Sequence, residues 1–147
     1  MPNWITITAD HLKAAGHGAI IDRGRTLAVG SIDPVNEAIT GATSRVRRAI
    51  STGNQLDLDT TKVPDSLREV CIRIALYALM RRIGLPLSED DRKQRDDDTS
   101  DLKRISDDRI RVEVADTPDA EGEMQPTPTP QIHRKHRDFT RRFTDGI

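Results

Sequence analysis

"VPDSLREVCIRIALYALMRRIGLP", residues 63–86, contains the longest apolar run in this chain of 147 residues. Pro64 suits the first turn of a helix, because its missing N–H would have no partner there. Arg81 and Arg82 favour the negative end of a helix dipole, and Gly84 is a typical helix terminator. The pattern predicts one long helix over most of this stretch.

Residues 74–80 carry no charge through nearly two helical turns. A helix that is apolar all round is buried all round, so we expect neighbouring helices or neighbouring subunits to enclose it. A bilayer span needs about 20 apolar residues, so this run is too short and we expect no membrane association. Cys71, the single cysteine, lies just before the run and is expected to be an inert buried residue.

A second helix is predicted over residues 33–50, "DPVNEAITGATSRVRRAI". Asp33 suits the N-cap and Pro34 the first helical position. Apolar residues at three- and four-residue spacing form one stripe: Val35, Ala38, Ile39, Ala42, Val46, Ala49 and Ile50. Gly41 disfavours the helix modestly and is a candidate for a close contact with another element.

The flanking segments have weaker patterns. Residues 7–16 predict a short helix, and residues 17–32 predict a loop, with a small hairpin at 20–29 as an option. Residues 88–108 predict a helix with almost no apolar stripe, which would be exposed, would bridge subunits or would be partly disordered. Residues 109–114, "RIRVEV", alternate like a half-buried strand that needs a partner.

Together these segments predict a mainly α fold: a small helical bundle with an extended C-terminal arm and at most one short strand or hairpin. We divide the chain into a helical domain (1–115), a Pro-rich linker (116–130) and a basic C-terminal docking tail (131–147). Hydrophobic residues are 35% of the chain and only four residues are aromatic. So thin a core is often stabilised by oligomerisation.

The tail has the opposite charge to the rest of the chain. Five basic residues and two acidic ones give residues 131–147 a charge of +3, so the remaining residues sum to −4 within the total of −1. Arginine and phenylalanine side chains can neutralise phosphates and stack on bases, or can anchor in a groove of another protein. The candidate partner-binding residues are Arg134, Arg137, Phe139, Arg141, Arg142 and Phe143.

Catalytic and metal-binding patterns are weak. The carboxylates of residues 88–101 alternate with basic residues, as on a solvated helix face. His133 and His136 are three residues apart, but no cysteine or carboxylate joins them at a ligand spacing. We therefore expect no enzymatic activity, no metal and no cofactor.

The order of these parts resembles the head–tail adaptor family of tailed bacteriophages, the head completion or connector proteins that include the Mu-like gp36 type. The resemblance covers roughly residues 3–107. It departs from the family at 51–61, where an aromatic- and Arg-containing segment is usual, and the linker and tail extend past the family's core. It is carried by a "VP" followed by Leu and by an apolar helix core: Val63, Pro64, Leu67, Ile74, Ala75, Tyr77 and Leu79.

This resemblance implies a structural virion protein at the neck, assembled in the host cytoplasm. Such proteins form a ring, commonly a dodecamer, below the portal protein. The ring extends the channel through which DNA passes without sequence specificity, and it docks the downstream neck or tail-completion protein. Catalysis and cofactors are not expected, and the acidic residues 88–101 would face a neighbour or the channel lumen.

On this interpretation the tail docks on the portal, and six residues are predicted to pack in the core or between subunits: Val46, Ile50, Leu67, Ile74, Tyr77 and Leu79. The alternative function is a small nucleic-acid-binding regulator that uses the tail as its arm. The acidic body and the lack of a basic recognition helix argue against that alternative.

Overall fold

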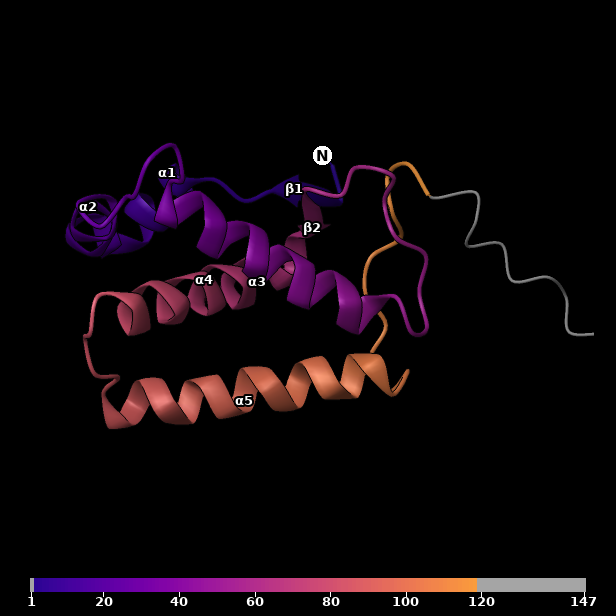
Figure 1. Ribbon diagram of the computed structural model, residues 1–147. Coiled ribbons are helices and arrows are strands. Elements are labelled where there is room, and N and C mark those ends of the chain that lie inside the picture. The colour runs from indigo at the N-terminus through magenta and orange to yellow at the C-terminus, as the bar shows by residue number, and fades with distance from the viewer. Residues whose placement is uncertain (1, 119–147) are drawn as a thin grey trace, which may run out of the picture.

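The computed structural model describes residues 2–118, and the predicted docking tail therefore lies outside the described residues. Within them the fold is mainly α, as predicted. Three helices form the body: α3 (Pro34–Ile50), α4 (Arg68–Arg82) and α5 (Glu89–Ser106). They run in alternating directions, and α3 contacts both of the others (Figure 1).

The helix α3 forms where its caps and its stripe predict it. The Asp33 carboxylate accepts a hydrogen bond from the Val35 amide at 2.9 Å, and Pro34 follows the cap directly. The apolar stripe faces α4, and Val35, Val46 and Ile50 are fully buried. Gly41 is exposed, and a Cβ atom there would meet nothing within 4 Å, so the described part of the chain makes no close contact at this glycine.

The helix α4 is only partly enclosed by the chain's own helices, so they do not bury it all round; enclosure by neighbouring subunits stays a prediction. Leu79 is fully buried, but Ala78 is exposed and Ile74 is only partly buried. The reason is the composition of α5, whose apolar residues Leu102 and Ile105 lie near its end. Burial therefore draws α5 onto the body at that end, and its first half provides no apolar cover for α4.

Cys71 lies in the core between α3 and α4 and is fully buried. Burial raises the pKa of its thiol to about 11, although the Thr43 hydroxyl, 3.8 Å away, acts in the opposite direction. The thiol is therefore protonated at neutral pH, as expected for an inert cysteine.

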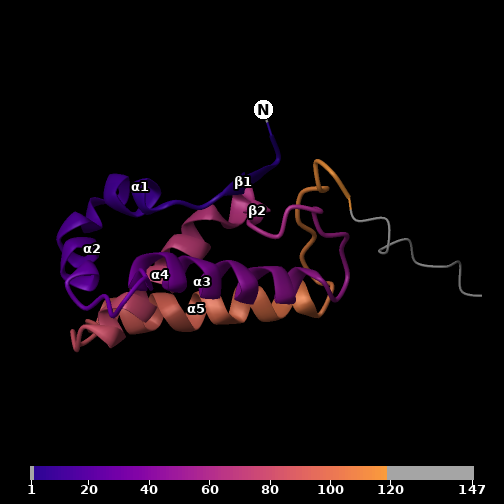
Figure 2. The ribbon, with the colours of Figure 1, turned by 45° about the horizontal axis from the view of Figure 1, so that its top comes forward.

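The N-terminal helices correct the prediction of a loop over residues 17–32 at residues 18–25, which are helical, whereas residues 27–32 form a loop as predicted. Helix α1 (Ala9–Leu12) is followed by residues Lys13–His17, where a kink at Gly16, with a φ of 88°, separates it from α2 (Gly18–Arg25). Helix α2 packs across α3 and α4 at one end of the body (Figure 2). A Cβ atom on Gly24 would lie 3.2 Å from the side chain of Leu79. Glycine thus allows the close approach of α2 to α4, rather than marking a turn or the optional hairpin.

Two short strands form a small antiparallel sheet: β1 (Trp4–Thr6) and β2 (Lys62–Pro64), with Ile5 opposite Val63. The predicted strand at 109–114 is wrong. This segment runs beside β1, but the Asp116 carboxylate binds the amides of Asn3 and Trp4, each at 3.0 Å. A side chain thus takes the place of a neighbouring strand's carbonyl groups.

Candidate interaction surfaces

A buried arginine holds the loop that follows α3. The Arg47 guanidinium donates hydrogen bonds to three backbone carbonyls, those of Asp57 (2.6 Å), Asp59 (2.9 Å) and Lys62 (2.8 Å). It also lies 5.7 Å from the centre of the Trp4 ring, in cation–π geometry. These contacts tie α3, the loop and β1 together at one end of the body.

Asp57 fixes the last described residues to the same end. Its carboxylate accepts hydrogen bonds from the amide and the hydroxyl of Thr117, both at 3.0 Å, and from the Asp59 amide at 2.9 Å. Burial raises the pKa of Asp57, but these hydrogen bonds outweigh it and the pKa lies below its ordinary value. The chain therefore leaves the described body at Pro118, at the end opposite α2 and the α4–α5 turn (Figure 1).

Three large apolar side chains are exposed in the loop after α3 and in the segment after α5: Leu58, Ile110 and Val114. The backbone amide of Leu58 donates to the carbonyl of Thr117 at 2.8 Å, so the loop after α3 and the segment after α5 meet here. Val114 is 72% exposed and Leu58 is 62% exposed. We call Leu58, Ile110 and Val114 the exit surface.

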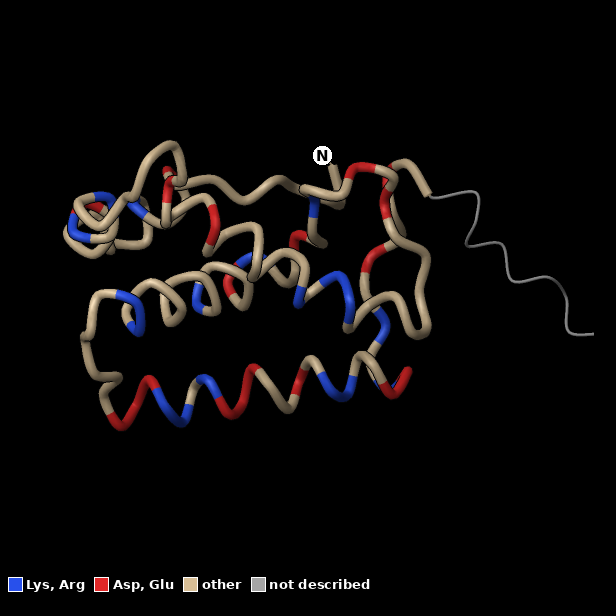
Figure 3. Tube along the Cα trace, in the orientation of Figure 1, with Lys and Arg blue, Asp and Glu red and all other residues tan. Residues whose placement is uncertain are grey.

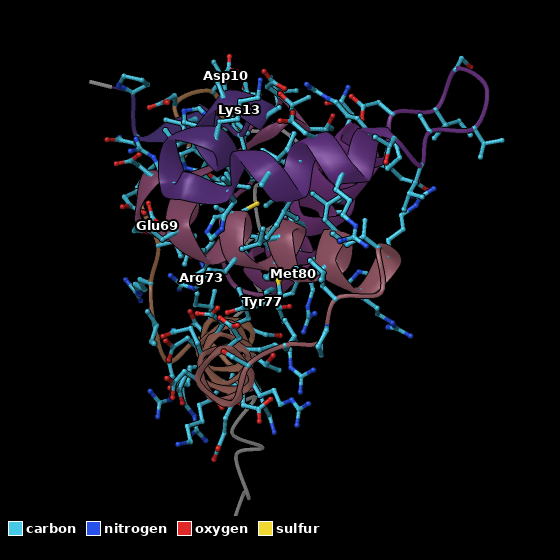
Figure 4. All side chains as sticks on the ribbon, turned by 90° about the vertical axis from the view of Figure 1, so that its left-hand side faces the viewer. Asp10, Lys13, Glu69, Arg73, Tyr77 and Met80 are labelled. Carbon is cyan, nitrogen blue, oxygen red and sulfur yellow. The ribbon has the colours of Figure 1, made fainter. Side chains whose placement is uncertain are left out.

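A second apolar surface lies at the opposite end. Residues 27–32 form a loop between α2 and α3 that projects from the body (Figure 4). Its tip is closed by a bridge between Val29 and Ile32, with Gly30 at a φ of 66° between them. Val29 is 78% exposed and Ile32 is 58% exposed. We call residues 27–32 the apolar loop.

The open side of α4 forms a groove against the first half of α5 and the turn before it. Its volume is about 590 Å³, and Ile74, Ala78 and Leu85 are among its apolar lining residues. Four arginines from three helices also line it: Arg45, Arg81, Arg92 and Arg95. We call this the arginine groove.

The predicted packing residues lie in or beside the core. Val46, Ile50, Leu67, Tyr77 and Leu79 are buried, and Ile74 is partly buried; Ile74 and Tyr77 line the arginine groove. The predicted docking residues, Arg134, Arg137, Phe139, Arg141, Arg142 and Phe143, lie outside the described residues. The sequence predicts a loop at residues 27–32, but not that its apolar side chains are exposed, and it does not predict the groove. Arginines from three helices make no local motif.

Within residues 2–118, no three His, Cys, Asp or Glu side chains are close enough together to hold a metal ion. None of the helices in the same range is long and apolar enough to cross a membrane.

Comparison with known proteins identifies the class. The sequence profile of the family described as "Bacteriophage Mu, Gp36" matches residues 7–127, which is most of the chain. The chain belongs to this family and is therefore a bacteriophage protein with a structural or assembly role. The predicted resemblance to the Mu-like gp36 type is confirmed at this level. No curated protein and no solved structure matches the chain.

Proposed function

We propose that the protein is a head–tail adaptor: a homo-oligomeric ring below the portal that extends the DNA channel and docks the next neck or tail-completion protein. The observation that carries this proposal is the presence of two separate apolar surfaces, the apolar loop and the exit surface, at opposite ends of one small bundle. Exposed apolar surfaces are typical of sites of protein contact.

Two different surfaces on one chain are what a ring requires. A two-fold dimer uses one self-complementary patch, whereas a head-to-tail contact joins two unlike patches and closes into a ring at a suitable rotation. Contact between the apolar loop of one copy and the exit surface of the next would bury Val29 and Ile32 against Leu58 and Val114. The thin core also gives the bundle a reason to gain stability by assembly.

The charge pattern fits a channel for DNA better than a DNA-binding site. Helix α5 has seven acidic and five basic residues, a net charge of −2, and its polar faces are exposed (Figure 3). A mildly negative wall repels phosphates, so DNA could slide past it without being held. This is consistent with DNA passing without sequence specificity.

Deletion of residues 131–147 tests the role of the tail. We expect the truncated protein to keep its helical circular dichroism spectrum and to lose attachment to portal-bearing heads. A matched variant, Phe139→Ala with Phe143→Ala, keeps every tail arginine and should lose most of the attachment, because the aromatic side chains would supply the burial. Normal attachment of the truncated protein contradicts portal docking by the tail.

The alternative of a nucleic-acid-binding regulator is favoured by one feature, the five basic residues of the tail. It predicts that the isolated protein binds DNA with a slope of log K against log salt of about −3 to −4, if four or five phosphates are neutralised. The alternative would be favoured over the adaptor if the protein binds DNA in this way without the portal and if deletion of the tail abolishes the binding.

A further inference from the structure

We propose that the arginine groove binds the acidic segment of residues 119–124 from a neighbouring copy of the chain. This inference rests on the head-to-tail ring proposed above and deepens it, since it names a second contact between copies. Three observations support this contact: the charge of the groove, the sequence of the segment and the place where the described chain ends.

Three of the four groove arginines have no carboxylate partner among residues 2–118. None of residues 2–118 forms an ion pair with Arg81 or Arg92. Arg45 donates only to the Thr99 hydroxyl, at a long 3.4 Å, and Arg95 pairs with the adjacent, exposed Asp96. An occupant with several carboxylates would therefore find free arginine donors, and arginine binds carboxylates with two parallel hydrogen bonds.

The groove also has an apolar side, formed in part by Ile74, Ala78 and Leu85. A suitable occupant thus combines acidic residues with small or apolar ones. A highly charged helix would not cover the apolar side of the groove. A basic segment would be repelled by the arginines.

The sequence of residues 119–124, "DAEGEM", has this combination. Asp119, Glu121 and Glu123 alternate with Ala120, Gly122 and Met124. In an extended segment, alternate side chains point to opposite sides, so the carboxylates would face the arginines while the small residues and the methionine face the apolar side. The tail at 131–147 has a charge of +3 and is the wrong sign for this groove.

Reach decides between the chain's own groove and a neighbour's. The described chain ends at Pro118, which pairs with Asp57 at the end of the body where α5 finishes, whereas the groove lies toward the N-terminal end of that helix. Arg92 precedes Ser106 by 14 residues, or about 21 Å of helix. From Pro118 to Glu123 an extended chain covers about 17 Å. The extended backbone of the segment is therefore shorter than the span to Arg92, which favours a neighbour's groove over the chain's own.

In the head-to-tail ring, the exit surface of one copy meets the end of the next copy that carries the apolar loop. The α4–α5 turn, which lines the arginine groove, lies at that same end. In this arrangement, the residues that follow Pro118 in one copy would begin close to the arginine groove of the next copy.

A charge swap with a rescue tests the inference in the full-length protein. With purified portal present, the variant Arg81→Glu with Arg92→Glu should raise the dissociation constant of the oligomer by about tenfold or more, measured by analytical ultracentrifugation. The variant Glu121→Arg with Glu123→Arg should do the same, and the four substitutions together should restore assembly. The matched control, Arg48→Glu with Lys103→Glu, changes two exposed basic residues of a different depression, between α3 and α5, and should assemble normally.

A synthetic peptide of residues 116–126 separates this inference from the ring proposal. Fluorescence anisotropy should show that the labelled peptide binds the full-length protein and does not bind the Arg81→Glu, Arg92→Glu variant, even if the protein forms no ring. Unchanged assembly of that variant, or no binding of the peptide, overturns the inference. Binding of a peptide of residues 131–147 in its place would show that the tail is the occupant, and overturns it too.

Discussion

Arg73 in α4 binds Asp98 in α5 through two hydrogen bonds, from Nε to Oδ2 at 2.9 Å and from Nη2 to Oδ1 at 2.6 Å. The side chain of Asp98 is 4% exposed, and the hydrogen bond to it raises the pKa of Arg73. Figure 4 looks along α5 and places Arg73 and Tyr77 on the side of α4 that faces it. This pair is the polar link between α4 and α5, beside the arginine groove.

Replacement of Asp98 by asparagine should lower the free energy of unfolding by about 2 kcal/mol, because the Arg73 charge loses its partner in a partly buried position. The estimate is below the value for a fully buried pair, since the Arg73 side chain is 29% exposed. Urea denaturation measures the change. The neighbouring Asp97→Asn serves as the control, because Asp97 is exposed and should matter by less than about 0.5 kcal/mol. Equal stability of the two variants would contradict the structural role of the pair.

Arg47→Lys should destabilise the protein by about 2–3 kcal/mol. A lysine has one donor group on a flexible stem and cannot satisfy three carbonyls that a planar guanidinium reaches together. Thermal unfolding measures the loss, and the exposed neighbour Arg48→Lys should leave the midpoint unchanged. A wild-type midpoint for Arg47→Lys would show that the loop of residues 57–62 is held by other contacts.

The attachment of residues 113–118 should depend on pH through Asp57. Its pKa in the folded protein is lowered from the ordinary value of 3.8. The unfolded state therefore takes up the proton first as pH falls, so the stabilisation is present above pH 3.8 and is lost as the pH falls through this value towards the folded pKa. The single tryptophan reports the change, because Trp4 Nε1 donates to the carbonyl of Glu113 at 3.1 Å.

The variant Asp57→Asn should flatten this acid-dependent change in Trp4 fluorescence. It keeps the size of the side chain and removes the titrating group. Asp59 also has a lowered pKa, through hydrogen bonds from the hydroxyl and amide of Thr61, so Asp59→Asn is the companion variant. An unchanged acid transition in the Asp57 variant would assign the dependence to other carboxylates.

The long helices could be predicted because their signals are local. Asp33 and Pro34 begin α3, and Ser88 begins α5, where its hydroxyl accepts from the Asp91 amide at 3.1 Å. The missed helix α2 depends on tertiary packing. Gly24 is in contact with Leu79, 55 residues later, and nothing in the local sequence distinguishes that glycine from one in a turn.

The surfaces were harder to predict than the helices. The segment 109–114 has the alternation of a strand, but the neighbouring amides of Asn3 and Trp4 are taken by the Asp116 side chain. The arginine groove depends on how far α5 diverges from α4, which no local pattern records. The sequence indicates the groove only indirectly. Helix α4 has a long uncharged run, and the helix that follows it, α5, has apolar residues only near its end.

The apolar loop should be needed for self-association and not for folding. Val29→Asp with Ile32→Asp places charges at the most exposed apolar positions of the loop, so the circular dichroism spectrum and unfolding midpoint should stay within about 0.5 kcal/mol of the wild type. Assembly should fail, because burial of the carboxylates is unfavourable. The isosteric control Val29→Thr should assemble weakly but detectably. Normal assembly of the aspartate variant would exclude the loop from the subunit contact.

A ring adaptor on the portal is distinguished from a monomeric protein by the mass of the assembled protein, measured alone and with purified portal present. Native mass spectrometry or multi-angle light scattering would give the copy number. The account predicts a closed ring with the portal, bound at a fixed ratio, and a monomer or a weak oligomer without it. If the protein stays monomeric in the presence of the portal, at concentrations well above those at which neck proteins assemble, it is not a ring adaptor.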